Sequence, residues 1–224
     1  MSLETIEIET GSSSTPASTP TASVILLHGL GADGSDFVSI VDELKLAAVG
    51  PVRFVFPSAP TRPVTINSGY VMRAWYDILG PGQPEDAAGL RASQALVEAL
   101  IAKEVARGVP ASRIVLAGFS QGCAMTFMTG LRHHERLAGL LGMSGYLPLA
   151  ELTAVERSAA NADVPIFQAH GSADTMIPMA RATWSRDALV TLGYPVEWHE
   201  YPMQDSVCPQ EIADMNRWLL KVLQ

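Results

Sequence analysis

The sequence predicts an α/β fold in which a mostly parallel sheet is covered by helices on both faces. Short apolar runs, typical of strands buried on both faces, alternate with longer segments of helical periodicity. Residues suited to catalysis follow directly after several of these runs, and in parallel sheets active groups gather at the carboxyl ends of the strands. The 224 residues, 48% of them apolar, suffice for one domain with a sizeable core.

Each element is predicted from the spacing of its apolar residues. The apolar runs predict strands at 5–9, 23–27, 53–56, 114–117, 137–143, 164–169 and 196–201. The first run alternates between apolar and polar residues and predicts an edge strand, whereas most of the others predict buried strands. Helical patterns cover 36–47, 85–107, 121–131, 178–192 and 209–223. The segment 149–161 is predicted to be a short connection, which leaves no room for a cap domain. We therefore expect an N-terminal edge strand and Ser/Thr/Pro-rich connector over 1–22, and a single domain over 23–224.

One long segment, 57–84, is rich in proline and glycine. Connections of that length in a compact domain are usually functional or partly structured, so we expect it to shape an accessible, shallow site. It carries Trp75 and Tyr76, which fit an acyl pocket and the core equally well.

Composition excludes several classes of function. The net charge of −8 and the lack of any Lys/Arg cluster argue against a nucleic-acid partner. No apolar run reaches the length of a membrane span, and the acidic, alternating N-terminus differs from a secretory signal. The 2 cysteines suggest no disulfide framework, so we expect a cytoplasmic location. No His/Cys spacing resembles a metal site, and His133 and His134 are predicted to lie on a solvated surface.

The stretch 113–124 is the centre of the functional prediction. Gly118, Ser120 and Gly122 match the G-x-S-x-G nucleophile elbow, with an apolar strand before the motif and a helical pattern after it. If the pentapeptide is considered without its context, the alternative interpretation is an ordinary turn between a strand and a helix. Glycine is needed where a Cβ would collide with neighbouring backbone. The N–H groups that open the following helix would favour the oxyanion formed when a serine attacks an acyl carbon.

A nucleophilic serine needs a base, and the base needs an orienting carboxylate. Asp174 follows a predicted strand and is the natural carboxylate, although it could instead cap the next helix. The glycine-rich loop after the first buried strand would supply the second half of an oxyanion hole. The donors would be the N–H groups of Leu30 and Gln121, and the alternative is a plain turn beside a packed His28.

Together these motifs resemble the bacterial carboxylesterase and acyl-protein thioesterase family, over nearly the whole chain from about Ser23. The matching stretches are Gly118-Phe119-Ser120-Gln121-Gly122, His28-Gly29-Leu30-Gly31, Ala74-Trp75-Tyr76-Asp77, His170-Gly171 with Asp174, and Tyr201-Pro202-Met203. The resemblance implies an α/β-hydrolase fold, hydrolysis of carboxylic esters or thioesters, no cofactor and frequent homodimers. It further implies Ser120 as nucleophile, Asp174 as orienting acid, Leu30 and Gln121 as oxyanion donors, and Trp75 beside the acyl site.

The chain departs from the family at one decisive position. The family carries its catalytic histidine shortly after Tyr-Pro-Met, and Asp205 occupies that position here. A carboxylate is a far weaker base than imidazole, and it would repel the carboxylate of Asp174. His199 lies within the last predicted strand, too far back to replace the missing histidine. We interpret His28 and His170 as packed scaffold residues.

Two functions follow from these residues. The first is a serine carboxylesterase acting on short- to medium-chain acyl esters or thioesters, impaired because Asp205 replaces the histidine. The second is a non-catalytic protein of the same fold that binds an acyl ligand or a partner. Hydrolysis of an amide or a lactone stays open as a third, because acyl transfers share the elbow chemistry.

Overall fold

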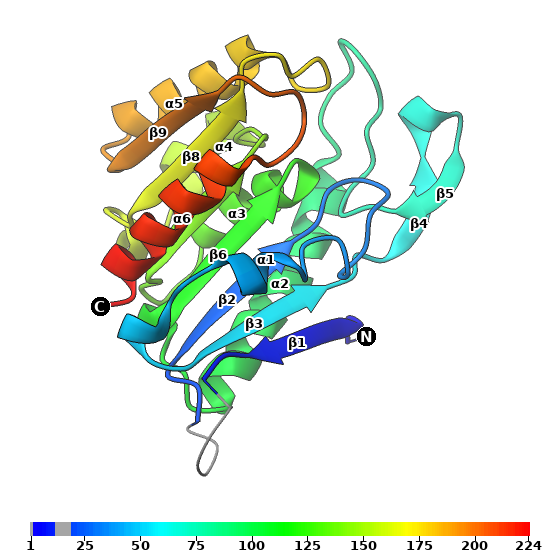
Figure 1. Ribbon diagram of the computed structural model, residues 1–224. Coiled ribbons are helices and arrows are strands. Elements are labelled where there is room, and N and C mark those ends of the chain that lie inside the picture. Colours follow the sequence, from blue (N-terminus) through cyan, green and yellow to red (C-terminus); the bar gives the residue numbers. More distant parts are fainter. Residues whose placement is uncertain (1, 12–18) are drawn as a thin grey trace.

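The computed structural model describes residues 2–11 and 19–224, so residues 12–18 of the predicted connector lie outside the described residues. A seven-stranded sheet crosses the molecule in the order β1-β3-β2-β6-β7-β8-β9 (Figure 1). Its strands are β1 (Thr5–Glu9), β2 (Ala22–Leu27), β3 (Val52–Pro57), β6 (Ile114–Phe119), β7 (Gly139–Met143), β8 (Ile166–Gly171) and β9 (Val196–Tyr201). Only the edge strand β1 runs antiparallel to its neighbour. The predicted mostly parallel sheet is confirmed.

Helices cover both faces of this sheet. They are α1 (Ile40–Glu43), α2 (Ala87–Ala106), α3 (Gln121–Gly130), α4 (Ala150–Glu156), α5 (Met179–Thr191) and α6 (Pro209–Val222). In Figure 1, α1 and α6 lie in front of the sheet and α2 and α3 lie behind it. Alternate strand residues enter two separate cores, since Val24 belongs to the core that includes Met215 of α6 while Ile25 belongs to the core that includes Leu90 of α2 and Phe127 of α3. The two-sided burial explains why the strands are apolar without alternation.

Two predicted elements differ in the structure. The helix expected over 36–47 is reduced to α1 and a short 3₁₀ turn (Ala47–Val49). Leu44 is extended, with φ −82° and ψ 139°, and the Lys45 N–H donates to the Asn216 side chain of α6 at 2.6 Å. A tertiary hydrogen bond therefore replaces the next helical one. The segment 149–161 contains α4 rather than a plain connection, because its Ala, Glu and Leu are strong helix formers.

The long segment 57–84 is partly structured, as predicted. It contains the two-stranded hairpin β4 (Thr61–Val64) and β5 (Tyr70–Arg73), which projects from the body of the molecule in Figure 1. The Gly31 N–H donates to the Arg73 carbonyl at 2.9 Å, so the hairpin is tied to the loop that follows β2. This places the segment at the carboxyl ends of the strands.

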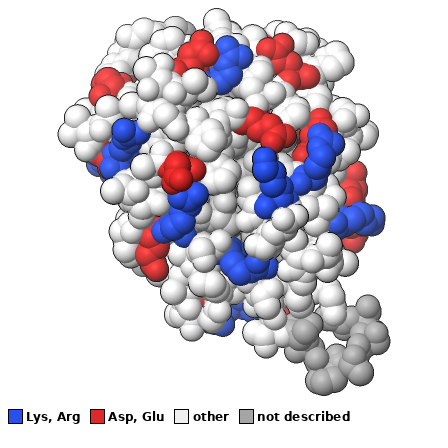
Figure 2. Space-filling view, turned by 90° about the vertical axis from the view of Figure 1, so that its left-hand side faces the viewer, with Lys and Arg blue, Asp and Glu red and all other residues white. Residues whose placement is uncertain are grey.

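Charged side chains of both signs are intermixed on the face that Figure 2 shows. No helix in the described ranges combines the length and apolar character that crossing a membrane requires.

Candidate active site

Ser120 stands at a sharp turn between β6 and α3. Its backbone has φ 54° and ψ −115°, a conformation that costs a non-glycine residue on the order of 1–3 kcal/mol. A Cβ on Gly118 would lie 2.1 Å from the Gly122 carbonyl oxygen, and one on Gly122 would lie 2.0 Å from that of Leu27. The turn is therefore open only to glycine at both positions. The Ser120 N–H donates to the Met143 carbonyl at 2.9 Å, which holds the turn against β7.

The loop after β2 lies directly beside this turn. A Cβ on Gly29 would lie 3.3 Å from the Ser120 Cβ, so the loop lies within contact distance of the serine. Leu30 lines the same pocket as Ser120, and its N–H makes no backbone hydrogen bond within the described part of the chain. The Gln121 N–H opens α3, where the first N–H groups have no partner within the helix. The two predicted donors therefore both lie near Ser120, Gln121 as the next residue and Leu30 as a lining residue of the same pocket.

His28 is part of the scaffold. Its Nδ1 lies 2.7 Å from the Gly29 carbonyl, to which it donates, and its Nε2 accepts from the Ala59 N–H at 2.9 Å. These two bonds fit a neutral ring, and burial lowers the pKa of this histidine. Because both nitrogens are engaged, His28 fixes the loop and is not available as a base.

The side chain of Gln121 clamps the segment after β5. Its Oε1 accepts from the Trp75 N–H at 2.7 Å and its Nε2 donates to the Tyr76 carbonyl at 2.8 Å. Trp75 is fully buried and donates its indole N–H to the His28 carbonyl at 2.9 Å. Tyr76 lines the pocket, and Trp75 is not among the lining residues. The predicted place of Trp75 beside the acyl site stays a prediction.

The two carboxylate oxygens of Asp174 lie in different environments. Its Oδ1 accepts from the N–H groups of Met176 and Ile177 at 2.8 and 2.9 Å, so the carboxylate does fix the turn before α5. Its Oδ2 is buried without a hydrogen-bond partner and lies 3.5 Å from Nε2 of His170. One oxygen is thus structural, and the other remains unsatisfied beside the pocket.

The loop after β9 brings Asp205 to the same place. The Ser172 N–H donates to the Tyr201 carbonyl at 2.8 Å, and the Ala173 N–H donates to the Met203 carbonyl at 3.0 Å. Gly171 allows this approach, because a Cβ there would lie 2.4 Å from the Gln204 carbonyl oxygen. The loop therefore lies over the end of β8, and Asp205 lines the pocket together with Ser120.

Asp205 sits in an unfavourable electrostatic environment. Burial raises the pKa of its carboxyl, the negative charge of Asp174 raises it further, and His170 opposes the rise. Its Oδ1 is buried and has no hydrogen-bond partner. Asp205 therefore senses the charge of Asp174, and His170 Nε2 lies within ion-pair distance of the free Asp174 oxygen, at 3.5 Å.

The pocket has a volume of about 840 Å³ and none of its lining residues is a histidine. His170 is fully buried and its Nε2 donates to the Ile177 carbonyl at 2.8 Å. His199 is bonded to Glu197 at 2.9 Å and stacks on Phe167, on the side of β9 that faces α6. Neither ring lines the pocket that holds Ser120.

Sequence reasoning missed two pocket residues, Tyr146 and Arg181. The Tyr146 hydroxyl lies 2.5 Å from that of Tyr76, and the Arg181 guanidinium stacks over the Tyr146 ring at 3.4 Å. Tyr146 follows shortly after the end of β7, and its place near a strand end was the signal available in the sequence.

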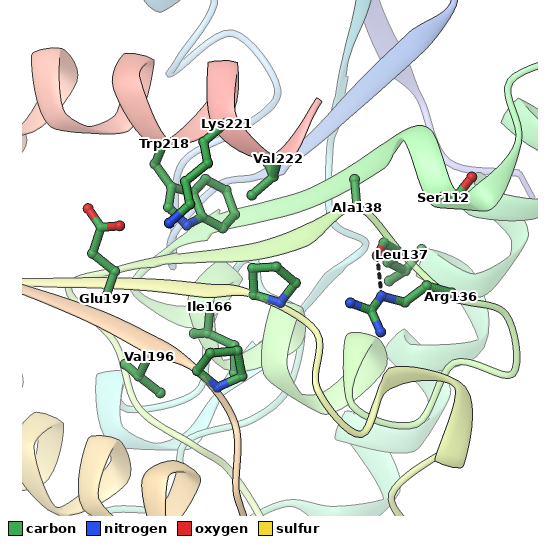
Figure 3. A pocket seen from close by; sticks show the side chains of 12 residues that line it. Ser112, Arg136, Leu137, Ala138, Ile166, Val196, Glu197, Trp218, Lys221 and Val222 are labelled. Carbon is green, nitrogen blue, oxygen red and sulfur yellow. Dashed lines mark hydrogen bonds between the residues drawn. The ribbon is translucent and has the colours of Figure 1, made fainter. Parts of the chain in front are cut away.

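Other clusters lie outside this pocket. Figure 3 shows a second cavity of about 850 Å³ at the amino ends of β8 and β9, lined partly by Ile166, Val196, Trp218 and Lys221 and by none of the predicted site residues. His133 is buried, which corrects its predicted solvated position, and it lies 2.5 Å from the Glu98 carboxylate. With exposed His134, these residues present three possible metal ligands within 4.8 Å of one another.

Comparison with known proteins agrees with this arrangement. The phospholipase/carboxylesterase family matches residues 11–223. Acyl-protein thioesterase 1 of Yarrowia lipolytica is 39% identical over 206 residues, which cover 89% of this chain and 91% of the relative. Acyl-protein thioesterase 1 of Neurospora crassa is 40% identical over 216 residues, which cover 91% of this chain and 87% of the relative.

Solved structures show the same similarity. The crystal structure of Zea mays acyl-protein thioesterase 2 superposes with a TM-score of 0.84 at 27% identity and covers 99% of each chain. Arabidopsis thaliana SOBER1 superposes with a TM-score of 0.85 at 28% identity and covers 91% of this chain and 99% of its own. The fold is that of the α/β-hydrolases, and the chain belongs to the phospholipase/carboxylesterase family of serine hydrolases.

Proposed function

We propose that this protein is a serine carboxylesterase whose substrates are short- to medium-chain carboxylic esters, with thioesters as the second class to test. The observation that carries the proposal is the position of Ser120, held at a strained turn beside two N–H groups that have no partner in the backbone. The relatives named acyl-protein thioesterase support hydrolysis of an acyl bond, with thioesters as the class that their names give.

In the proposed mechanism, the Ser120 hydroxyl attacks the acyl carbon and forms a tetrahedral intermediate. The N–H groups of Leu30 and Gln121 stabilise its oxyanion, a contribution typically worth about 3–4 kcal/mol for one such donor. Collapse releases the alcohol or thiol and leaves an acyl-enzyme, which water then hydrolyses. Both halves need a base that takes a proton and returns it.

The base is the weak part of this mechanism. We propose that Asp205 occupies the position of the family's histidine, with Asp174 as the acid that would orient such a ring. Asp205 cannot donate to Asp174 when it is ionised, and a raised carboxyl pKa still leaves a poorer base than imidazole. The present sequence should therefore retain the activity of its binding site and oxyanion donors alone, roughly 10³–10⁴-fold over water.

Replacing Asp205 with histidine tests this directly. We expect Asp205→His to raise the turnover of p-nitrophenyl butyrate by on the order of 10²–10⁴-fold, the usual size of a general-base contribution. The control is the double variant Ser120→Ala/Asp205→His, which should return to background. Equal turnover by the unchanged chain and Asp205→His would place the base elsewhere and contradict the assignment.

The alternative is a non-catalytic binder of an acyl ligand, favoured by the absence of histidine among the pocket-lining residues. A fluorophosphonate probe separates the two functions, with Ser120→Ala as the blank. Labelling at Ser120 that is faster than labelling of free serine supports a residual esterase. Absence of labelling in both the unchanged chain and Asp205→His supports the binder.

The homodimer, the cytoplasmic location and the division into 1–22 and 23–224 stay predictions. Sedimentation of the full chain at several concentrations tests the first of these.

A further inference from the structure

A cluster of possible metal ligands joins α2 to the connection between α3 and β7, outside the Ser120 pocket. Glu98 lies on α2, and His133 and His134 follow the end of α3. One ligand atom from each residue lies within 4.8 Å of the other two, and none of the three residues lines the pocket of Ser120. The spacing of the histidines did not reveal the cluster, because Glu98 lies 35 residues before His133.

The buried ring of His133 is suited to a metal ion. The side chain is 2% exposed, and its Nδ1 lies 2.5 Å from Oε2 of Glu98, to which it donates. Its Nε2 is buried and has no hydrogen-bond partner within the described residues. In the neutral ring, Nδ1–H donates and Nε2 carries an unused lone pair, which is the form in which histidine binds metals. The Glu98 carboxylate has further lone pairs, so its bond to His133 leaves it able to bind a cation as well.

The connection that carries the two histidines is held in place by Asn161. This side chain is fully buried, and its Nδ2 donates to the carbonyls of His133 and Glu135 at 2.9 and 2.7 Å. Its Oδ1 accepts from the Leu137 N–H at 2.9 Å. The rings of His133 and His134 lie beside each other, with their centroids 4.7 Å apart. A metal ion would therefore meet ligands whose backbone is already ordered, which lowers the cost of binding.

The charges around the cluster favour a cation. The Glu135 carboxylate lies 3.5 Å from Nε2 of His134, so a second acid stands beside the ligands. The arginines that adjoin these residues in the chain are each paired with an acid outside the cluster, as Arg132–Glu156 and Arg136–Asp163. The exposed side chain of His134 gives an ion a route to the cluster from solvent.

We propose that Glu98, His133 and His134 bind a Zn²⁺ ion. Imidazole nitrogens and carboxylate oxygens are ordinary zinc ligands, and three of them leave the fourth tetrahedral position to water. Ligand atoms about 2.0–2.1 Å from zinc lie roughly 3.4 Å from one another, so the exposed His134 side chain has to close over the ion. The bound ion would join α2 to the connection after α3 and stabilise the fold. The site is independent of the proposed esterase function, because it lies outside the Ser120 pocket.

Titration of the full chain with zinc tests the site. After removal of metal with EDTA, isothermal titration calorimetry at about pH 7.5 should show saturable binding of one ion per chain, and the melting temperature should rise with zinc concentration. His134→Ala and Glu98→Gln should each weaken binding at least about 10-fold, because each removes a direct ligand. Binding should also weaken between about pH 7.5 and pH 5.5, since protons compete for both imidazoles.

His199→Gln is the matched control. His199 is also bonded to a glutamate, Glu197 at 2.9 Å, but it lies on β9 and has no comparable cluster of ligands among the described residues. This variant should bind zinc as tightly as the unchanged chain, and circular dichroism should show that all variants are folded. Failure of zinc to bind saturably below about 1 mM would overturn the proposal. Unchanged affinity in either His134→Ala or Glu98→Gln would overturn it as well.

Discussion

The two sides of the Ser120 pocket differ in how completely their polar groups are hydrogen-bonded. On the elbow side, the Ser120 N–H and both ends of the Gln121 side chain are hydrogen-bonded, and Gly118 and Gly122 meet backbone atoms at distances that exclude any side chain. On the side of the loop after β9, Asp205 Oδ1 lacks a partner, as does Asp174 Oδ2 across from it. Glu211, in the first turn of α6, is fully buried, and neither of its oxygens has a hydrogen bond of good geometry, although the Cys208 N–H is a nearby donor.

This difference separates what the fold requires from what the reaction requires. The elbow is fixed by a backbone hydrogen bond and by steric contacts, which a side chain added at Gly118 or Gly122 would disturb. The loop after β9 is held by its backbone, through the Ser172 and Ala173 N–H groups, and these bonds do not depend on the residue at 205. The path of the loop can therefore persist while the side chain at position 205 changes.

The largest expected effect comes from adding a methyl group to the elbow. Gly122→Ala would place its Cβ 2.0 Å from the Leu27 carbonyl oxygen, so β2 and α3 would have to separate. We expect the free energy of unfolding to fall by at least about 3 kcal/mol, measured by urea denaturation. Gly82→Ala is the matched control, because Gly82 has φ 72° but no atom within 4 Å, and it should cost about 1 kcal/mol. Equal costs would mean that the elbow is not sterically fixed.

Removal of the Gln121 clamp should have the next largest effect. Gln121→Ala leaves the buried Trp75 N–H without an acceptor and removes the bond to the Tyr76 carbonyl. An unsatisfied buried group costs about 1–3 kcal/mol, so we expect a loss of about 2 kcal/mol in unfolding free energy. Gln204→Ala, on the exposed part of the loop after β9, should change stability by less than about 0.5 kcal/mol. A comparable loss for the two variants would remove the contrast between the sides.

The sequence was sufficient to predict the buried strands and the positions of the candidate site residues at strand ends, because both depend on local patterns. Apolar runs predict strands buried on both faces, and Leu30, Ser120 and Asp174 all follow strand ends. The extent of α1 was not predictable, because it ends where Asn216, far along the chain, binds the Lys45 N–H. The same holds for His133, which is buried and bonded to Glu98, 35 residues earlier in the chain. Contacts that are distant in sequence leave no periodic signal.

Glu211 offers a pH-dependent test of the side formed by the loop after β9 and α6, where polar groups lack hydrogen-bond partners. Burial raises the pKa of its carboxyl to about 8, the nearby Asp214 adds to the rise, and the Cys208 N–H opposes it. The folded chain therefore binds this proton more tightly than the unfolded chain, and stability falls as pH rises from about 4.5 to about 8. Glu211→Gln cannot ionise, so thermal denaturation should show a flatter pH profile and a relative gain of about 1–2 kcal/mol at pH 8. Parallel profiles would show that water or a partner satisfies the carboxylate.

The smallest expected effect on stability comes from the carboxyl group of Asp205. Burial and the charge of Asp174 raise the pKa of Asp205 above its ordinary 3.8, so the folded chain holds this proton to higher pH than the unfolded chain. The stability that the protonated form contributes is present below pH 3.8 and is lost as pH rises through the raised value.

Asp205→Asn removes that loss. Because the residue is partly exposed and water screens its charge, the relative gain above this window should be only about 0.5–1 kcal/mol. Thermal denaturation of both chains between pH 4 and pH 8 measures it, and the double variant Asp174→Asn/Asp205→Asn should show less gain from the second change than from the first if the two acids repel each other. Additive gains would mean that Asp205 and Asp174 do not sense each other. The loop after β9 would then be as relaxed as the elbow, and only its chemistry would distinguish the two sides of the pocket.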